Sequence, residues 1–489
     1  MALTDIRSDA ASGWIPWTAA ERENFFSAIA RHNRAAWRVT LASAVAIAFT
    51  SAIVATLMAP LFYAAIALAF DLVNLIVPTP NLVQLLGDAI SPAIDHPEAV
   101  APARWLQLAL CAALPGLVWM ALVVLALRRM LLASALFGPG PIARPCNPSA
   151  LEEQRLANVV GEMAVAANLP APRVEVTDQA ILNGVIFGRD ERDAKVLVSE
   201  ALLARLSREE LQGVAGHLVG SIANGDMAIG LRASVALSLF ALVARMAAIL
   251  PDSAIGRHSW VLWHAILVPT SSRARQLALE LGDPFGESNS DGTNASAGPP
   301  RSDPTVHKSE GNWRTLLWLP LAGPIVITGF FAGLVNLFVL GPLVSLAWRQ
   351  RKYMADATAV RLTRDPDALA HALEKMSGAG APLTPWTAHL SVIQTAVARS
   401  GPLGASAVPM FPSVDRRLRA LAKLGAHVSR PPRRMPLPLV LILAALCAVA
   451  GVLIALVLYL LVILSTALTM LFTGLPFGIL HLLLRWLGH

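Results

Sequence analysis

The sequence predicts a multi-pass α-helical membrane protein with a mainly α (α+β) domain. Of its 489 residues, 55% are hydrophobic and only 15% are charged, which is too apolar for a soluble chain of this length. Four blocks contain no Asp, Glu, Lys or Arg: 39–70, 105–127, 315–348 and 435–484. A span needs roughly 20 apolar residues, so each block is long enough to cross a bilayer. The segments 128–230 and 349–434 have globular composition instead.

The basic residues predict the orientation of the spans. Arg22, Arg31, Arg34 and Arg38 precede the first block, whereas 79–103 contains neither Lys nor Arg. The positive-inside rule therefore places this loop outside and the globular segments in the cytoplasm. The first 38 residues are too long and polar for a cleaved signal peptide, so the first span is expected to be a retained anchor.

The organisation along the chain follows from these blocks. Four to six spans are expected, because 39–77 and 435–484 are each long enough to cross twice. Arg245 interrupts the apolar run 231–250, so the side of the polar loop that follows stays open. The expected order is a cytoplasmic segment 1–38, a transmembrane block 39–78, an external loop 79–104, a span 105–127, a first domain part 128–230, a membrane insertion 231–348 with a flexible loop 271–312, a second domain part 349–434 and a C-terminal transmembrane block 435–489.

Local patterns predict the elements of the domain. A Ser149–Glu152 capping box and apolar residues at helical spacing predict a helix over 149–167. Short strands are expected at 172–178 and 194–203, around a charged, Gly-rich turn at 182–193. A second box, Ser207–Glu210, opens a helix that carries "VAGHLVGSIANGD", residues 214–226.

Several residues have membrane explanations. Trp313, Trp318 and Trp348 are expected as anchors at the membrane interface. A basic cluster before the last block fits juxtamembrane residues better than a nucleic-acid site: Arg416, Arg417, Arg419, Lys423, Arg430, Arg433 and Arg434. Cys111 and Cys447 lie in spans and Cys146 in a linker, so no disulfide framework is expected.

Four segments together resemble a known family. They are "EEQRLANVVGEMAVAANLPAPRVEV", "LNGVIFGR", "VLVSEALLARLSREELQGVAGHLVGSIANGD" and "RQRKYMADATAVRLTRDPDALAHALEKM", with a weaker match in "FPSVDRRLRALAKLGA". In order and spacing they resemble the HtpX and CAAX-prenyl-protease-like membrane zinc metallopeptidases, peptidase family M forty-eight. The resemblance covers about 148–228 and 349–376 and implies a zincin-like cytoplasmic domain. Such a site has two His at i and i+4, a carboxylate ligand from a second helix and a Glu base after the first His.

The chain departs from that pattern at most of these positions. His217 occupies the first ligand position, but Leu218 stands at the base position and Ser221 at the second ligand position. Lys352 replaces the carboxylate ligand, and Phe411 replaces a His that the family has before Pro. Asp356, which matches a residue that supports the ligands, is kept as well as His217. The resemblance therefore implies vestigial ligand positions without bound zinc, and no cofactor is expected.

Three further hypotheses concern this site. The Lys352 ammonium is expected to stand in for the metal by satisfying Asp356 and a backbone carbonyl near His217. Asn183 is either a residue of a remaining peptide cleft or an ordinary turn Asn. Glycine in a helix costs up to about 1 kcal/mol of stability relative to alanine. Gly213, Gly216 and Gly220 must therefore permit an arrangement that a larger residue would prevent. Gly216 and Gly220 either form a GxxxG-like surface for close packing or occupy the space left by the lost metal shell.

The expected function is that of a catalytically inactive pseudopeptidase in a bacterial inner membrane. It would bind or regulate membrane proteins or an active peptidase. Its expected partners are the lipid bilayer and a membrane protein or a second copy, without nucleic acid. The alternative is an active zinc metalloendopeptidase with non-standard ligands, for which the candidates are Glu209, Glu210, Asp226 and His371. A transporter or channel is disfavoured, because the apolar blocks lack charges that would line a path.

Overall fold

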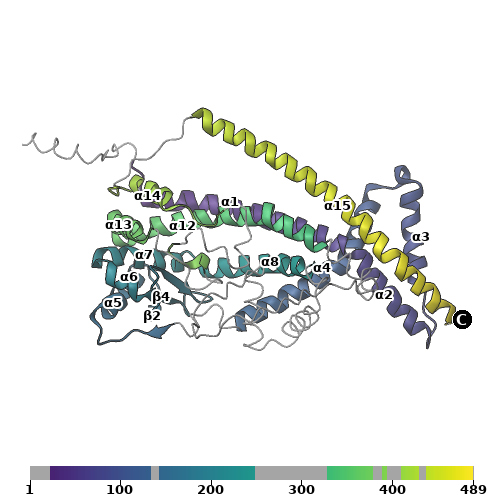
Figure 1. The fold of residues 1–489 in the computed structure, drawn as a ribbon, viewed down its shortest axis with the longest axis horizontal. Helices are drawn as coiled ribbons and strands as arrows, with labels where there is room; N and C mark the ends of the chain where they lie inside the picture. Colours follow the sequence, from purple (N-terminus) through teal and green to yellow (C-terminus); the bar gives the residue numbers. More distant parts are fainter. Residues whose placement is uncertain are drawn as a thin grey trace, which may run out of the picture.

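The computed structural model shows an elongated molecule with long helices at one end and an α/β domain at the other (Figure 1). The long C-terminal helix α15 runs obliquely across the bundle, and its C-terminal end lies beside α2. The residues that the structure describes are 22–133, 143–247, 328–377, 388–393, 409–428 and 437–487. The loop expected at 271–312, Trp313 and Trp318 lie outside them.

The N-terminal half of the bundle contains four helices. They are α1 (Phe25–Leu57), α2 (Ala59–Asn74), α3 (Leu82–Asp95) and α4 (Pro102–Ala133), with a 3₁₀ turn η4 (Pro97–Ala99) between the last two. Within the described residues, three helices are long and apolar enough to cross a membrane: Phe25–Leu57, Pro102–Leu125 and Thr328–Thr363. The predicted class, a multi-pass helical membrane protein with a small amount of sheet, is confirmed.

The C-terminal block forms the single helix α15 (Leu437–Leu487). A double crossing was expected from its length, but a helix without a turn cannot fold back on itself. Asp71 of α2 is buried and pairs with two residues near the end of α15. His481 Nδ1 lies 2.5 Å from one carboxylate oxygen and Arg485 Nε lies 2.7 Å from the other. Arg485 also donates to the carbonyl oxygens of Thr79 and Pro80.

The α/β domain is built around a four-stranded sheet of order β1-β2-β4-β3. The strands are β1 (Arg144–Pro145), β2 (Arg173–Thr177), β3 (Gly184–Phe187) and β4 (Lys195–Ser199). β2 pairs in parallel with β4, and the other neighbours are antiparallel. The prediction of a turn over 182–193 was wrong for its first part, since β3 lies there. All four residues of β3 are buried, and only 188–193 forms the turn before β4.

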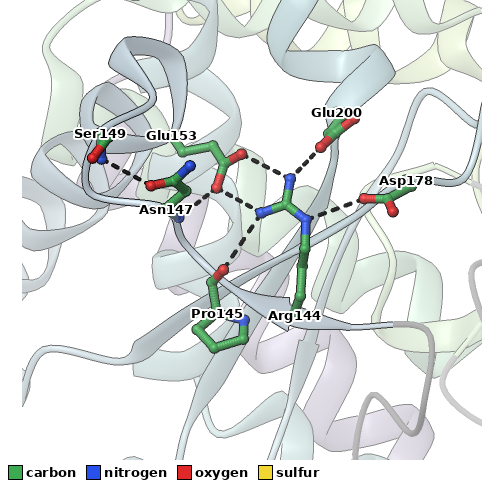
Figure 2. A network of polar contacts seen from close by, with 7 residues as sticks. All are labelled: Arg144, Pro145, Asn147, Ser149, Glu153, Asp178 and Glu200. Atoms are coloured by element: carbon green, nitrogen blue, oxygen red, sulfur yellow. Dashed lines mark hydrogen bonds and ion pairs between the residues drawn. The ribbon is translucent and has the colours of Figure 1, made fainter.

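One arginine joins several elements of this domain (Figure 2). Arg144 of β1 donates to both carboxylate oxygens of Glu153, at 2.8 and 2.9 Å, and also contacts Asp178 and Glu200. These contacts hold the start of α5 (Leu151–Ala166), the end of β2 and the start of α6 (Glu200–Arg205) together. The predicted Ser149–Glu152 capping box is absent: α5 begins after Ala150, which makes no side-chain cap bond.

The remaining helices enclose the sheet and lead back to the membrane. α7 (Arg208–Ala223) begins with the predicted capping box at Ser207 and Glu210, and α8 (Asp226–Ala247) follows it. The helix Thr328–Thr363 contains a π-helical turn η7 (Asn336–Leu340) and α12 (Gly341–Thr363). α13 (Pro366–Met376), the 3₁₀ turn η8 (Ala388–Leu390) and α14 (Val414–Lys423) complete the domain. α1 and α12 run side by side (Figure 1), so the N-terminal segment from residue 22 onward is packed against the domain.

Candidate functional site

The centre of the candidate site is helix α7, which is buried on all sides. Every residue from Gly213 to Ile222 is buried, as expected for a helix in the interior of a domain. The helix packs against β3 on one side and against α12 and α13 on the other. A side chain can therefore enter the domain centre from α7 without reaching solvent.

The three glycines of α7 allow its close approach to α12 and α13. A Cβ at Gly213 would lie 2.6 Å from the backbone nitrogen of Leu369 in α13. At Gly216 and Gly220 a Cβ would lie 3.1 Å from the side chains of Thr363 and Thr358 in α12. This face of α7 is occupied within the chain, so close internal packing accounts for glycines that are costly in an isolated helix.

His217 projects from α7 and contacts Asp356 of α12. It is fully buried, and its Nδ1 lies 2.8 Å from Asp356 Oδ1. Burial lowers the pKa of His217 to about 4, although the hydrogen bond to Asp356 opposes this change. The imidazole is therefore neutral at pH 7, and the hydrogen-bond pattern places its proton on Nδ1. His217 Nε2 has no hydrogen-bond partner within the described part of the chain.

Asp356 is held by an arginine that was expected elsewhere. Arg417 of α14 donates through Nη2 and Nε to the two oxygens of Asp356, at 2.6 and 2.9 Å. A third donor, Nη1, lies 2.5 Å from the carbonyl oxygen of Val392. The interpretation of Arg417 as a juxtamembrane residue was wrong, since its side chain is 1% exposed and carries a fork-shaped ion pair in the interior.

Lys352, the residue at the third ligand position, is buried but does not bind Asp356. Its ammonium donates to the carbonyl oxygen of Ser391 at 2.7 Å and lies 4.9 Å from the centre of the Phe411 ring. The expected pairing of Lys352 with Asp356 was wrong, because Arg417 and His217 already contact both carboxylate oxygens. The backbone carbonyl that Lys352 does contact belongs to Ser391, in the segment beside β3. Phe411 supplies an aromatic face for the cation at the place where the family has a histidine.

The other two family positions lie on the same helix as His217. Leu218 is 1% exposed, and its side chain reaches β3, since a Cβ on Gly184 would lie 3.1 Å from Leu218 Cδ1. Ser221 is also buried, and its hydroxyl oxygen has no partner among the described residues. The i, i+4 pair of this site therefore offers one neutral imidazole nitrogen and one hydroxyl.

Asn183 binds a short segment of the chain beside β3. Its amide group donates to the carbonyl oxygen of Ile393 at 2.8 Å, and its carbonyl oxygen accepts from the N–H of Ile393 at 3.3 Å. The same oxygen accepts from the N–H of Gly184 at 2.9 Å. Asn183 therefore both caps the start of β3 and recognises the backbone of an extended segment.

The candidate replacement ligands are not brought to His217. Glu210 caps α7 and pairs with Lys375, and Glu209 accepts from the hydroxyl of Ser207. Asp226 pairs with Arg351, whose Nε lies 2.6 Å from it, and His371 is exposed on α13. In the described ranges, no three His, Cys, Asp or Glu side chains lie where they would hold a metal ion. The described residues at the centre therefore do not supply the three protein ligands that zinc needs, and the protonated form of Lys352 would repel a divalent cation.

Three participants in this site were absent from the sequence-based prediction. Trp348 was expected at the membrane interface, but it is 2% exposed and its Nε1 donates to the carbonyl oxygen of His389 at 2.8 Å. The segment 388–393 gave no signal, because it takes part through backbone groups. Arg417 did give a signal of burial in the sequence, because it lies at helical spacing on the apolar stripe of Val414, Leu418 and Leu421.

Comparison with known proteins gives a consistent assignment. The model of peptidase family M48 matches residues 150–424, more than half of the chain. The chain is 29% identical over 288 residues to a protein named Protease HtpX homolog from Thermoanaerobacter pseudethanolicus, covering 58% of this chain and 75% of that relative. Relatives of the same name occur in Tropheryma whipplei, 27% identical over 60% of this chain and 78% of the relative, and in Streptococcus uberis, 29% identical over 45% and 56%. No solved structure matches. The matched residues contain the whole α7–α12–α14 site, and the chain belongs to peptidase family M48 as an HtpX-like member.

Proposed function

We propose that this chain is a metal-free, non-cleaving member of its family that works by binding polypeptide. The observation that carries the proposal is the set of residues at the former catalytic positions: His217, Leu218, Ser221 and Lys352. Lys352 and Arg417 lie at the centre of the domain, and burial lowers the pKa of Lys352 to about 7, so that a large part of its amines stay protonated at neutral pH. Among the described residues, Asp356 is the carboxylate that contacts His217. Such a centre suits carbonyl and carboxylate oxygens as ligands and disfavours a divalent cation.

The chemistry of peptide hydrolysis is missing at the same positions. A general base contributes roughly 100-fold to 10,000-fold to such a reaction, and Leu218 cannot accept a proton. His217 is tied to Asp356 through Nδ1, which leaves one nitrogen to act. A single imidazole without a second ligand or a nearby base provides neither a metal site nor an activated water.

The location of the chain suggests which proteins it binds. Three helices are long and apolar enough to span a membrane, and one of them leads directly into the site helix α12. We infer that the domain faces the cytoplasm of a bacterial cell, since the basic residues flank the predicted inner ends of the first two spans. Its partners would then be segments of membrane proteins, or a peptidase to which it delivers them.

Elemental mass spectrometry of the detergent-purified full chain tests this proposal. The wild-type chain and a His217→Ala variant are expected to contain no stoichiometric zinc. A triple variant, Leu218→Glu, Ser221→His and Lys352→Glu, restores the family's donors and is expected to bind about one zinc per chain. About one zinc in the wild-type chain, lost in His217→Ala and accompanied by cleavage of an unfolded test protein, would overturn the proposal in favour of a zinc endopeptidase with unusual ligands.

A further inference from the structure

A short segment of the chain lies along the open edge of the sheet. In the sheet order β1-β2-β4-β3, β3 is an edge strand. Ser391 forms an antiparallel bridge with Val185 of β3, and the N–H of Val392 donates to the carbonyl oxygen of Gly184 at 2.9 Å. Residues 391–393, which follow the 3₁₀ turn η8, therefore lie along β3 as an added strand would. Adding a strand is a common way for a domain to bind an extended peptide.

The carbonyl groups of this segment are held by side chains from three other parts of the domain. Four of its carbonyl oxygens each accept a hydrogen bond at 2.5 to 2.8 Å. The donors are Trp348 to His389, Lys352 to Ser391, Arg417 to Val392 and Asn183 to Ile393. All of these contacts are made to the main chain. The carbonyl groups of 391–393 lie in the extended part, so any extended polypeptide offers these three acceptors, whereas that of His389 lies in the 3₁₀ turn.

Most side chains of the segment are apolar. The exception is His389, which is buried and whose ring centre lies 5.0 Å from that of Trp348. Leu390, Val392 and Ile393 are at most 5% exposed and pack in the apolar core. The Ser391 hydroxyl is buried without a hydrogen-bond partner in the described part of the chain. The groove is therefore suited to an extended peptide with apolar side chains and gains nothing from the serine that occupies it.

We propose that residues 388–393 are an internal ligand, which an extended apolar segment of a membrane protein displaces by adding a strand to β3. This inference rests on the proposed function and names both the ligand class and the regulation of the site. An empty groove would be unfavourable in free energy, because the donors of Lys352, Arg417, Trp348 and Asn183 would be buried without acceptors. Exchange of one strand for another keeps the donors of Lys352, Arg417 and Asn183 satisfied.

Release of the internal segment tests the inference. Val392→Pro removes the N–H that bonds Gly184 and leaves Asn183, Lys352 and Arg417 unchanged. The probe is a fluorescent peptide, WTAHLSVIQT, which copies residues 386–395. An intramolecular ligand competes at an effective concentration in the mM range, so its release should tighten binding of the peptide to the full chain at least about 10-fold.

Two matched controls accompany this measurement. Glu191→Pro lies in the exposed turn between β3 and β4 and should leave peptide binding at the wild-type level. A peptide with Pro in place of the valine that matches Val392 should not bind either chain, because it lacks the N–H. Equal affinity of wild type and Val392→Pro for the probe would overturn the inference.

A covalent lock provides a second test that does not depend on the proline variant. Val185→Cys with Ser391→Cys places two thiols at the antiparallel bridge, in a chain whose Cys111, Cys146 and Cys447 are replaced by Ser. The oxidised form should not bind the peptide, and reduction should restore wild-type binding. Unchanged binding in the oxidised form would overturn the inference even if the chain contains no zinc. Stoichiometric zinc in the wild-type chain would instead overturn the proposed function.

Discussion

Two buried clusters of the same composition lie toward opposite ends of the molecule (Figure 1). Each contains one Asp, one His and one Arg. In the domain, Asp356 contacts His217 at 2.8 Å and Arg417 at 2.6 Å. In the helical bundle, Asp71 contacts His481 at 2.5 Å and Arg485 at 2.7 Å.

The clusters differ in the elements that they join. His217, Asp356 and Arg417 come from three helices far apart in sequence, and all three side chains are at most 1% exposed. His481 and Arg485 lie one turn apart on α15 and together fasten this helix to α2. Arg485 is 13% exposed and also contacts the backbone of Thr79 and Pro80. The domain cluster should therefore be part of the cooperative core, whereas the bundle cluster attaches a single helix.

Replacing each arginine with alanine tests whether the two clusters differ in this way. Of the changes proposed, it has the largest expected effect on the free energy of unfolding. Arg417→Ala leaves Asp356 buried without its main partner, and such losses cost about 3–5 kcal/mol of the free energy of unfolding. Arg485→Ala should cost about 1 kcal/mol, because Asp71 keeps His481 and the site is partly open to solvent. Thermal unfolding of the detergent-purified chain measures both, with exposed Arg416→Ala as a neutral control. Equal destabilisation by the two variants would contradict the distinction.

A glycine substitution tests whether the domain cluster depends on the close approach of its helices. Gly213→Ala places a methyl group 2.6 Å from backbone nitrogen in α13, so α7 must shift, at an expected cost of about 3 kcal/mol. Gly161→Ala in α5 is the matched control, since no atom lies within 4 Å of its Cβ. It should stabilise the chain by up to about 1 kcal/mol through helix propensity. Both changes are measured in the same unfolding assay, and a tolerated Gly213→Ala would show that the packing of α7 can relax.

The pH dependence of stability sharpens the comparison further. The imidazole pKa is about 6.5 in an unfolded chain but about 4 for buried His217. Between these values the unfolded state binds more protons, so stability falls as the pH drops from about 6.5 to 4 and is level below. This contribution is about 2 kcal/mol between pH 7.5 and pH 5. His217→Gln should remove that part of the pH dependence, while His371→Gln, on an exposed residue of α13, should retain it; identical profiles for all three chains would contradict the assignment.

The sequence allowed most of the architecture to be predicted. Apolar blocks located the membrane helices, and the Ser207–Glu210 box located the start of α7, because both signals are local. β3 was missed because its three apolar residues, Val185 to Phe187, are enclosed by glycines and charges that resemble a turn. Its strand character comes from pairing with β4, a contact between segments that local pattern does not encode.

The candidate site was predictable in its positions but less so in its contacts. The resemblance located His217, Ser221, Lys352 and Asp356 on two helices that the structure brings together. It did not reveal that Arg417 holds Asp356, because that arginine lies in a basic run that also suits a membrane surface. The segment 388–393 was not predictable, since binding through backbone carbonyls leaves no characteristic residue type.

The helix that ends at the site is longer than a bilayer core is thick, and this length has a mechanical consequence that we expect in a membrane. Thr328–Thr363 contains 36 residues, about 54 Å of helix, whereas a bilayer core is about 30 Å thick. A span of roughly 20 residues from Thr328 ends before Lys352, so we expect Lys352 to project beyond the hydrocarbon region. Helices adjust to a thicker or thinner bilayer by tilting, and a change of about 10° would move the projecting end by about 4 Å. A lever of this kind would convert membrane thickness into a displacement of the ammonium that holds Ser391.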